Sequence, residues 1–346
     1  MSQFDDILVT GGAGYIGAIL VPKLLERGHR VTVLDGFFFG YEPLDPVADN
    51  DRLEFIEGDI RDREFVDRVF EEGSYDAVIH LAAISNDPSS KLDADLTTSV
   101  NRDAVQYVMK VAKEAGVERL LYASSASVYG IKETENVTED LSLNPITLYA
   151  KYKAEGEDYL NDLVDDDFCG VSVRAATVCG YSPRLRLDLV INILTSHALN
   201  RGEIRVYGGD QMRPNVHVED ISDFYLHLLD ADREKINGEA FNVSHSNYSV
   251  MGLAELIRDT LESDIDITVE PTDDNRSYHL SAEKAAKILD FHPQHPLEEA
   301  VRDLEEAYNA GKWREHDAIE YHNVRWMQDH PEDWNFGGRE YLPTGE

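Results

Sequence analysis

Two hydroxyl-bearing segments of this sequence carry residues suited to the oxidation of an alcohol. In the first, Tyr149 and Lys153 are separated by three residues, so on a helix they share one face. A free tyrosine phenol is a poor base at neutral pH, but an adjacent ammonium and a positively charged nicotinamide favour its phenolate form. We therefore predict that Tyr149 removes the alcohol proton while a hydride leaves the carbinol carbon for a dinucleotide.

The second segment is an apolar stretch, 120–123, that ends in the hydroxyls of Ser124 and Ser125. Ser125 is predicted to hydrogen-bond the substrate oxygen as it becomes a carbonyl. The spacing Tyr-x-x-x-Lys is common by chance on solvated helices, so by itself it is a weak signal. It becomes informative only downstream of a dinucleotide-binding pattern.

That pattern lies near the N-terminus. An apolar run, 7–9, enters the glycine-rich turn Thr10-Gly11-Gly12-Ala13-Gly14-Tyr15-Ile16-Gly17, which opens a predicted helix. Glycines let the backbone approach a pyrophosphate, and the helix N-terminus offers free N–H groups. Asp35 ends the next apolar run, 18 residues after Gly17, at the interval expected of a carboxylate that binds a ribose 2′-hydroxyl. That carboxylate would repel the 2′-phosphate of NADP, so the predicted cofactor is NAD.

Alternating strands and helices must position these residues. Strands are expected at 6–10, 30–35, 53–57, 76–81, 118–123 and 170–175, and helices at 15–27, 62–72, 95–115 and 149–164. This alternation predicts an α/β fold with a Rossmann-type, doubly wound parallel sheet. We assign 1–180 to an NAD-binding domain that carries the catalytic residues. We assign 181–346 to a smaller substrate-binding lobe, partly interleaved with the first domain.

The composition restricts location and partners. Of the 346 residues, 67 are acidic and 32 are Lys or Arg, giving a formal net charge of −35. Such a charge makes nucleic acid and anionic membranes poor partners, and it favours a cytoplasmic protein of a salt-loving organism because molar salt screens self-repulsion. No run of 18 apolar residues and no signal peptide is recognised. Two cysteines without a CxxC pair or a His-rich cluster predict no metal site.

Taken together, these motifs resemble the extended short-chain dehydrogenase/reductase family, in its NAD-dependent nucleotide-sugar epimerase/dehydratase branch. The resemblance covers residues 6 to 310 or so. Besides the glycine-rich turn and the Tyr149–Lys153 segment, it rests on Gly58-Asp59-Ile60-Arg61-Asp62, His80-Leu81-Ala82-Ala83, Val100-Asn101, Ser124-Ser125-Ala126-Ser127-Val128-Tyr129-Gly130 and Arg213-Pro214-Asn215-Val216-His217-Val218-Glu219-Asp220.

The resemblance implies a role for each motif. Ser125, Tyr149 and Lys153 would form the catalytic triad, and two arginines, Arg213 and Arg276, would bind the substrate diphosphate. Tyr149 and Lys153 would also contact the cofactor, and the other cofactor contacts would be Gly11, Gly14, Tyr15, Ile16, Gly17, Asp35, Asp59, Ile60, Leu81, Ala82, Ala83 and Asn101. Helices near 95–115 and 149–164 would build a homodimer.

Departures from the family pattern narrow the reaction. The 4,6-dehydratases carry Thr-Asp-Glu where this chain has Ser125, Ala126 and Ser127, so dehydration is disfavoured. The Arg-Tyr-Phe-Asn segment of UDP-galactose 4-epimerases is replaced by Arg174-Ala175-Ala176-Thr177, which leaves the sugar and nucleotide open. Ser127 and Thr177 are candidate substrate contacts.

We therefore predict epimerisation through a transient 4-keto sugar. A ketoreductase or dehydrogenase with net NAD(H) turnover and a non-catalytic redox sensor remain as alternatives.

Overall fold

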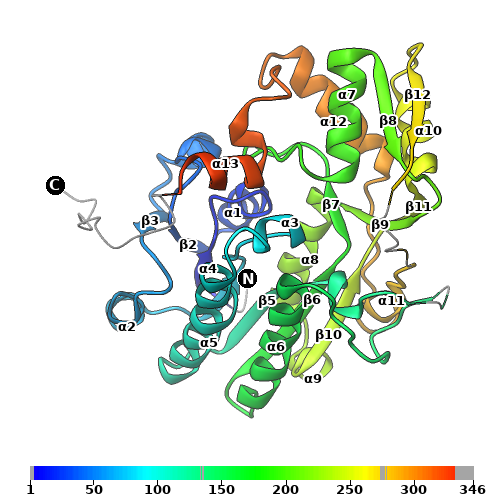
Figure 1. Ribbon diagram of the computed structural model, residues 1–346. Coiled ribbons are helices and arrows are strands. Elements are labelled where there is room, and N and C mark those ends of the chain that lie inside the picture. The colour runs from blue at the N-terminus through cyan, green and yellow to red at the C-terminus, as the bar shows by residue number, and fades with distance from the viewer. Residues whose placement is uncertain (1–3, 133, 135, 273–276, 278, 332–346) are drawn as a thin grey trace.

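A seven-stranded parallel sheet forms the centre of the molecule (Figure 1). The computed structural model describes residues 4–132, 134, 136–272, 277 and 279–331. The strand order is β10-β6-β5-β4-β1-β2-β3. From β1 the chain adds β2 and β3 on one side and then crosses over to add the later strands on the other side, as in a doubly wound fold. The strands are β1 (Asp6–Thr10), β2 (Arg30–Asp35), β3 (Leu53–Glu57), β4 (Ala77–His80), β5 (Arg119–Ser125), β6 (Cys169–Ala175) and β10 (Glu239–Val243). The predicted α/β fold class is confirmed.

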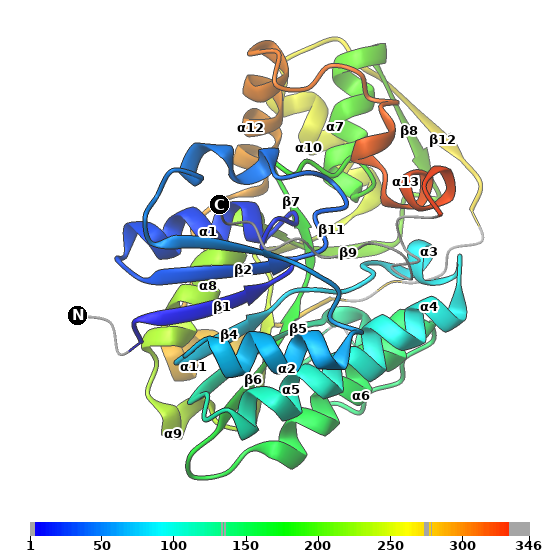
Figure 2. The ribbon, with the colours of Figure 1, turned by 90° about the vertical axis from the view of Figure 1, so that its left-hand side faces the viewer.

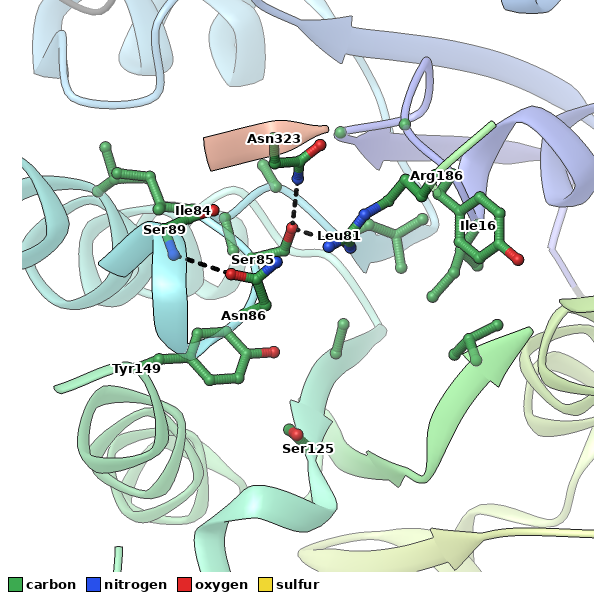
Figure 3. A pocket seen from close by; sticks show the side chains of 18 of the residues that line it. Ile16, Leu81, Ile84, Ser85, Asn86, Ser89, Ser125, Tyr149, Arg186 and Asn323 are labelled. Carbon is green, nitrogen blue, oxygen red and sulfur yellow. Dashed lines mark hydrogen bonds between the residues drawn. The ribbon is translucent and has the colours of Figure 1, made fainter. Parts of the chain in front are cut away.

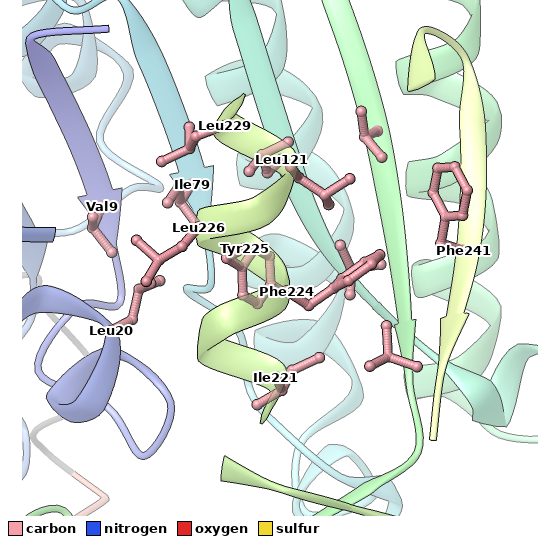
Figure 4. Packing of buried hydrophobic residues seen from close by; sticks show 14 of the residues in the cluster. Val9, Leu20, Ile79, Leu121, Ile221, Phe224, Tyr225, Leu226, Leu229 and Phe241 are labelled. Atoms are coloured by element: carbon pink, nitrogen blue, oxygen red, sulfur yellow. The ribbon is translucent and has the colours of Figure 1, made fainter. Parts of the chain in front are cut away.

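Helices cover both faces of this sheet (Figure 2). One face carries α1 (Gly17–Glu26) and α8 (Val218–Asp230), and the other carries α2 (Arg63–Glu72), α5 (Val105–Glu114) and α6 (Leu148–Leu163). Figure 4 shows Phe224 and Tyr225 of α8 packed against Leu121 and Ile79 of the sheet. Burial on both faces explains why the strands are nearly continuous apolar runs in the sequence.

The chain after residue 180 alternates between a second lobe and the central sheet. The lobe contains α7 (Val190–Arg201), α10 (Val250–Thr260) and α12 (Leu297–Asn309), packed on the two-stranded sheet of β8 (Glu203–Tyr207) and β12 (Asp266–Glu270). A three-stranded sheet of β7 (Thr177–Cys179), β9 (Met212–His217) and β11 (Ser246–Ser249) lies between the two parts. The segment 181–346 contributes to the second lobe and also to the central part of the molecule, because β10 is a strand of the central sheet and α8 packs on that sheet.

The expected helix at 95–115 is interrupted in its hydrogen-bonding pattern. The structure has α4 (Ala94–Thr98), one π-helical stretch (Ser99–Ala104) and then α5. A π-turn inserts an extra residue, which rotates the side chains that follow it and is frequent at functional sites. The stretch contains Asn101, so the irregularity falls on a predicted site residue.

Short elements complete the chain. They are the helical turns Glu42–Val47, Ala126–Tyr129 and Ile319–Tyr321, and the helices α3 (Asp87–Ser90), α9 (Arg233–Ile236), α11 (Glu283–Leu289) and α13 (Asn323–Asp329). α13 lies beside α3 although more than 200 residues separate them (Figures 1 and 2). Among the described residues, no helix has both the length and the apolarity needed to cross a membrane.

Candidate active site

A cavity of about 550 Å³ opens at the carboxyl ends of β1, β4, β5 and β6. In a doubly wound sheet this is where ligands bind. The structure brings together nearly all of the predicted site residues here, and those that line the cavity are Gly11, Gly14, Tyr15, Ile16, Gly17, Asp35, Asp59, Ile60, Leu81, Ala82, Ala83, Ser125, Ser127, Tyr149, Lys153, Thr177 and Arg213. Arg276 lies outside the described residues.

The glycine-rich turn is shaped so that side chains cannot be added to it. Gly11 has φ +73°, and a Cβ at that position would lie 2.6 Å from the backbone nitrogen of Ala82. A Cβ on Gly17 would lie 2.3 Å from the carbonyl oxygen of Gly12. The Ile16 side chain does not cap α1, and the amides of Ala18 and Ile19 donate to the carbonyl oxygens of Gly14 and Ile16, so the amides that an anion could use are those before Ala18. The turn therefore fits a diphosphate.

Asp35 is fixed at the end of β2 by backbone amides. Its Oδ2 accepts a hydrogen bond from Ala13 N at 3.0 Å, and its Oδ1 accepts one from Phe37 N at 2.9 Å. Burial raises the pKa of this carboxyl group, and the backbone hydrogen bonds oppose that shift. The backbone amide of Gly36 contacts the carboxylate as well. A carboxylate has about four acceptor positions, so it can still accept from a ribose hydroxyl.

Tyr149 and Lys153 project from the first turns of α6. Thr147 caps this helix, since its Oγ1 accepts a hydrogen bond from Ala150 N at 3.1 Å. Lys153 Nζ donates to the carbonyl oxygen of Ala123 at 2.6 Å and lies 5.7 Å from the centre of the Tyr149 ring. The cap and the strand carbonyl thus hold the phenol and the ammonium on one side of the cavity.

Ser125 faces this pair from the end of β5. In Figure 3 the Tyr149 hydroxyl and the Ser125 side chain both point into the cavity. Ser125 Oγ accepts hydrogen bonds from Ser127 N at 3.2 Å and from Ser127 Oγ at 3.0 Å. Because both of these contacts use its lone pairs, the hydroxyl proton of Ser125 remains available to a substrate oxygen.

Two basic groups of the site are buried, Lys153 itself and His80. Burial lowers the pKa of Lys153 to about 7, and the charge of Glu157 opposes this shift. Burial, together with the charge of Lys153, lowers the pKa of His80 to about 3. His80 is therefore neutral, and its Nδ1 lies 2.8 Å from Thr10 Oγ1 at the end of β1. Its role in the site is to fix two neighbouring strand ends.

The lowered pKa of Lys153 predicts a pH-dependent stability. The group titrates near 10.5 when unfolded and near 7 in the native state, so between these values the unfolded chain binds more protons and stability rises with pH. Relative to the variant Lys153→Met, the free energy of unfolding should rise by up to about 1.4 kcal/mol per pH unit above pH 7. Urea unfolding of the cofactor-free proteins at pH 7, 8 and 9 measures this difference. Parallel pH profiles of the two proteins would contradict the prediction.

Asn101 lies behind the cavity wall and does not line it. Its Nδ2 donates to the carbonyl oxygen of Ile84 and its Oδ1 accepts from Ile84 N, both at 2.8 Å. Ile84 itself lines the cavity. Asn101 therefore acts on the cavity through the backbone of the segment that follows β4, which the π-helical stretch allows it to reach.

Sequence reasoning missed a second group of cavity residues. Arg186 pairs with Asp188 through two contacts of 2.9 and 3.0 Å and also donates to Ser85 Oγ at 3.2 Å. The carboxylate of Asp188 accepts a further hydrogen bond from Asn86 Nδ2 at 3.0 Å. Arg184 and Asn323 complete the group. The alternation of charged and apolar residues in Arg184-Leu185-Arg186-Leu187-Asp188 was a usable signal. No local pattern marks Asn323.

Comparison with known proteins identifies the family of this chain. The model of the "NAD dependent epimerase/dehydratase family" matches residues 7–244. A UDP-glucose 4-epimerase of Lactobacillus helveticus is 30% identical over 329 residues, which cover 89% of this chain and 96% of that protein.

Solved structures give the same result. The structure of a UDP-glucose 4-epimerase from Thermotoga maritima with UDP-glucose has a TM-score of 0.80 at 27% identity, covering 88% of this chain and 99% of that one. A dTDP-glucose 4,6-dehydratase from Streptomyces venezuelae, solved with NAD bound, has a TM-score of 0.80 at 26% identity, covering 90% and 100%. The chain therefore belongs to the NAD-dependent epimerase/dehydratase family, and it is an enzyme whose cofactor is NAD.

Proposed function

We propose that this enzyme epimerises a nucleotide-linked sugar through a transient 4-keto intermediate. The observation that carries the proposal is the meeting of Ser125, Tyr149 and Lys153 around the cavity that contains the dinucleotide cradle. NAD, when bound, supplies reversible hydride transfer. Tyr149 takes the proton of the sugar hydroxyl, and Ser125 donates a hydrogen bond to the same oxygen as it becomes a carbonyl. Once the ketone has rotated in the pocket so that its other face is presented for reduction, Tyr149 would return the proton to the same oxygen.

The wall beside the catalytic strand supports epimerisation over dehydration. Elimination of water needs an additional acid and base next to the sugar, and the two residues after Ser125 are Ala126 and Ser127. The Asp188 carboxylate, which also lines the cavity, is paired with Arg186 and accepts from Asn86. Ser127 and Thr177 lie on the cavity surface as proposed sugar contacts, and Arg213 is the proposed contact of the substrate diphosphate.

Product analysis distinguishes epimerisation from net oxidation or reduction. The purified protein would be incubated with UDP-, GDP-, CDP- and dTDP-sugars without added cofactor, and the stereochemistry at C4 followed by NMR. We expect interconversion of one C4 pair with no accumulation of absorbance at 340 nm. Stoichiometric NADH formation would support a dehydrogenase instead, and the absence of any reaction with intact bound NAD would support a sensor.

The acidic surface leads to a salt prediction. With a net charge of −35, screening should stabilise the folded state as the Debye length falls from about 10 Å at 0.1 M salt to about 3 Å at 1 M. We propose that the enzyme works in a cytoplasm rich in salt, and we expect its unfolding temperature and activity to rise with KCl over this range. Thermal unfolding in a KCl series measures this, with sucrose as a control for solvent exclusion. Full stability in dilute buffer would contradict it.

We further propose a homodimer in which α5 and α6 of each subunit pack against those of a second copy. Both helices lie on one outer face of the sheet layer (Figure 2). Light scattering after gel filtration in high salt should give twice the chain mass of 39.0 kDa. A monomer at micromolar concentration would contradict this assembly.

A further inference from the structure

Arg184 is a buried cation in the cavity wall, near three carboxylates of the described chain but in an ion pair with none of them. Its side chain is about 5% exposed, and its guanidinium carbon lies 3.5 Å from the centre of the Phe39 ring. Its Nη1 donates to the carbonyl oxygen of Leu185 and its Nη2 to Asn323 Oδ1, both at 2.6 Å. Within the described part of the chain, no carboxylate forms an ion pair with it. Burial and the charge of Arg186 lower its pKa to about 9, although the nearby carboxylates of Asp188, Asp35 and Glu320 oppose this shift.

Two other buried arginines of the described chain form an ion pair, and a third is held at the C-terminal end of a helix. Arg174 pairs with Glu157, and Arg186 pairs with Asp188. Arg119 donates to the carbonyl oxygens of Leu228 and Leu229, at the negative C-terminal end of α8. A buried charge without such compensation is costly. Arg184 therefore calls for an anion supplied by a ligand of the cavity that it lines.

The position of Arg184 indicates which ligand supplies the anion. The segment just before it is attached to the glycine-rich turn, because Ser182 Oγ donates to the carbonyl oxygen of Tyr15 at 2.8 Å and Tyr15 Oη donates to that of Gly180 at 2.6 Å. On its other side, Phe39 follows closely after Asp35 at the end of β2. Arg184 therefore follows a segment that is tied to the glycine-rich turn, and its guanidinium lies on Phe39 and within electrostatic range of Asp35.

The C-terminal helix holds Arg184 in this place. Asn323, the first residue of α13, accepts the hydrogen bond from Arg184 and donates from Nδ2 to Ser85 Oγ at 3.1 Å, across the cavity wall (Figure 3). Trp326 of the same helix packs against Phe39, the ring on which Arg184 lies, and the two ring centres are 5.4 Å apart. Residues from three distant parts of the chain therefore fix one guanidinium.

We propose that Arg184 is a cofactor-binding residue whose guanidinium pairs with the diphosphate of NAD, and that Asn323 is the residue that positions it. Guanidinium groups pair with phosphate oxygens through directed, charge-assisted hydrogen bonds. The nucleotide-sugar substrate also carries a diphosphate, but Arg184 is tied to the cofactor turn and to Phe39. The proposal concerns the cofactor alone, so it holds whichever sugar the enzyme converts.

Arg184→Gln tests the proposal directly. We expect affinity for NAD and for ADP-ribose to fall about 10- to 100-fold, because a hydrogen bond to a charged group is lost, while UDP affinity changes less than about twofold. Calorimetric titration of the cofactor-free protein measures all three. The unfolding temperature of the cofactor-free variant should equal or exceed that of the native protein, because a buried unpaired charge is removed. A residue with only a structural role would lower that temperature.

Asn323→Asp is the second variant, and it tests whether Arg184 binds the cofactor even if Arg184→Gln fails to fold. The new carboxylate would neutralise Arg184 internally, so NAD retained through gel filtration should decrease although the chain stays folded by circular dichroism. Arg325→Gln is the matched control, since Arg325 lies on the same helix with an exposed side chain 3.4 Å from Asp317. Unchanged NAD affinity in the folded Arg184→Gln or Asn323→Asp variant, or a loss of UDP affinity in place of NAD affinity, would overturn the proposal.

Discussion

Tyr149→Phe should lower kcat by about 10²- to 10⁴-fold, the usual contribution of a positioned proton acceptor, while leaving NAD bound. The phenol is the group that the geometry places opposite Ser125, and removing one oxygen atom leaves the ring and the helix start unchanged. Because the hydroxyl acts on the substrate proton, we expect the KM for the sugar nucleotide to change much less than kcat. Steady-state rates with a coupled assay, together with the NAD content of the purified variant, measure both effects.

Tyr152→Phe provides a matched control for this variant. Tyr152 is on the same helix three residues later, and its hydroxyl lies 2.7 Å from Thr98 Oγ1, away from the catalytic pair. It should retain activity close to that of the native enzyme, with a small loss of stability from the lost hydrogen bond. Equal rate losses in the two variants would mean that Tyr149 acts through the folding of α6 and not on the substrate.

The strands were predictable because of how the sheet is buried. The inner strands are covered on both faces, so they appear in the sequence as apolar runs bounded by turns, whereas the edge strand β3 is only partly buried and carries two glutamates. The predicted segments 6–10, 30–35 and 53–57 coincide with β1, β2 and β3. The residues at the carboxyl ends of such strands are brought together by the parallel arrangement itself. This is why the predicted cofactor and catalytic residues meet in one cavity.

The remaining cavity residues depend on tertiary packing that no local pattern encodes. Arg184 lies within a loop, and its partner Asn323 comes from a helix 139 positions later in the chain. Helical periodicity predicts a regular helix around Asn101, but this residue contacts Ile84 from a π-helical stretch that no local pattern marks. Nothing local in residues 239–243 indicates that they join the central sheet beside β6, as β10 does.

Replacement of Glu157 should cause the largest loss of stability. This carboxylate is about 3% exposed and pairs with Arg174 through contacts of 2.6 to 3.1 Å, and it accepts a hydrogen bond from Ser124. Glu157→Gln would leave Arg174 as a buried, unpaired charge, so we expect the free energy of unfolding to fall by about 3–5 kcal/mol. Urea unfolding monitored by circular dichroism measures the change.

The surrounding network explains why the loss should also reach the active site. Arg174 Nη1 donates to Tyr129 Oη, which donates to Asn242 Oδ1, both at 2.7 Å, so α6 and three strands of the sheet are joined beneath Ser125. Glu155→Gln is the control, because Glu155 forms only an exposed pair with Lys151 at 3.6 Å and should cost less than about 1 kcal/mol. A double variant, Glu157→Leu with Arg174→Met, should recover stability because neither charge remains. If Glu157→Gln cost no more than Glu155→Gln, Arg174 would have to find another partner, and the buried pair would not be what fixes the end of β5.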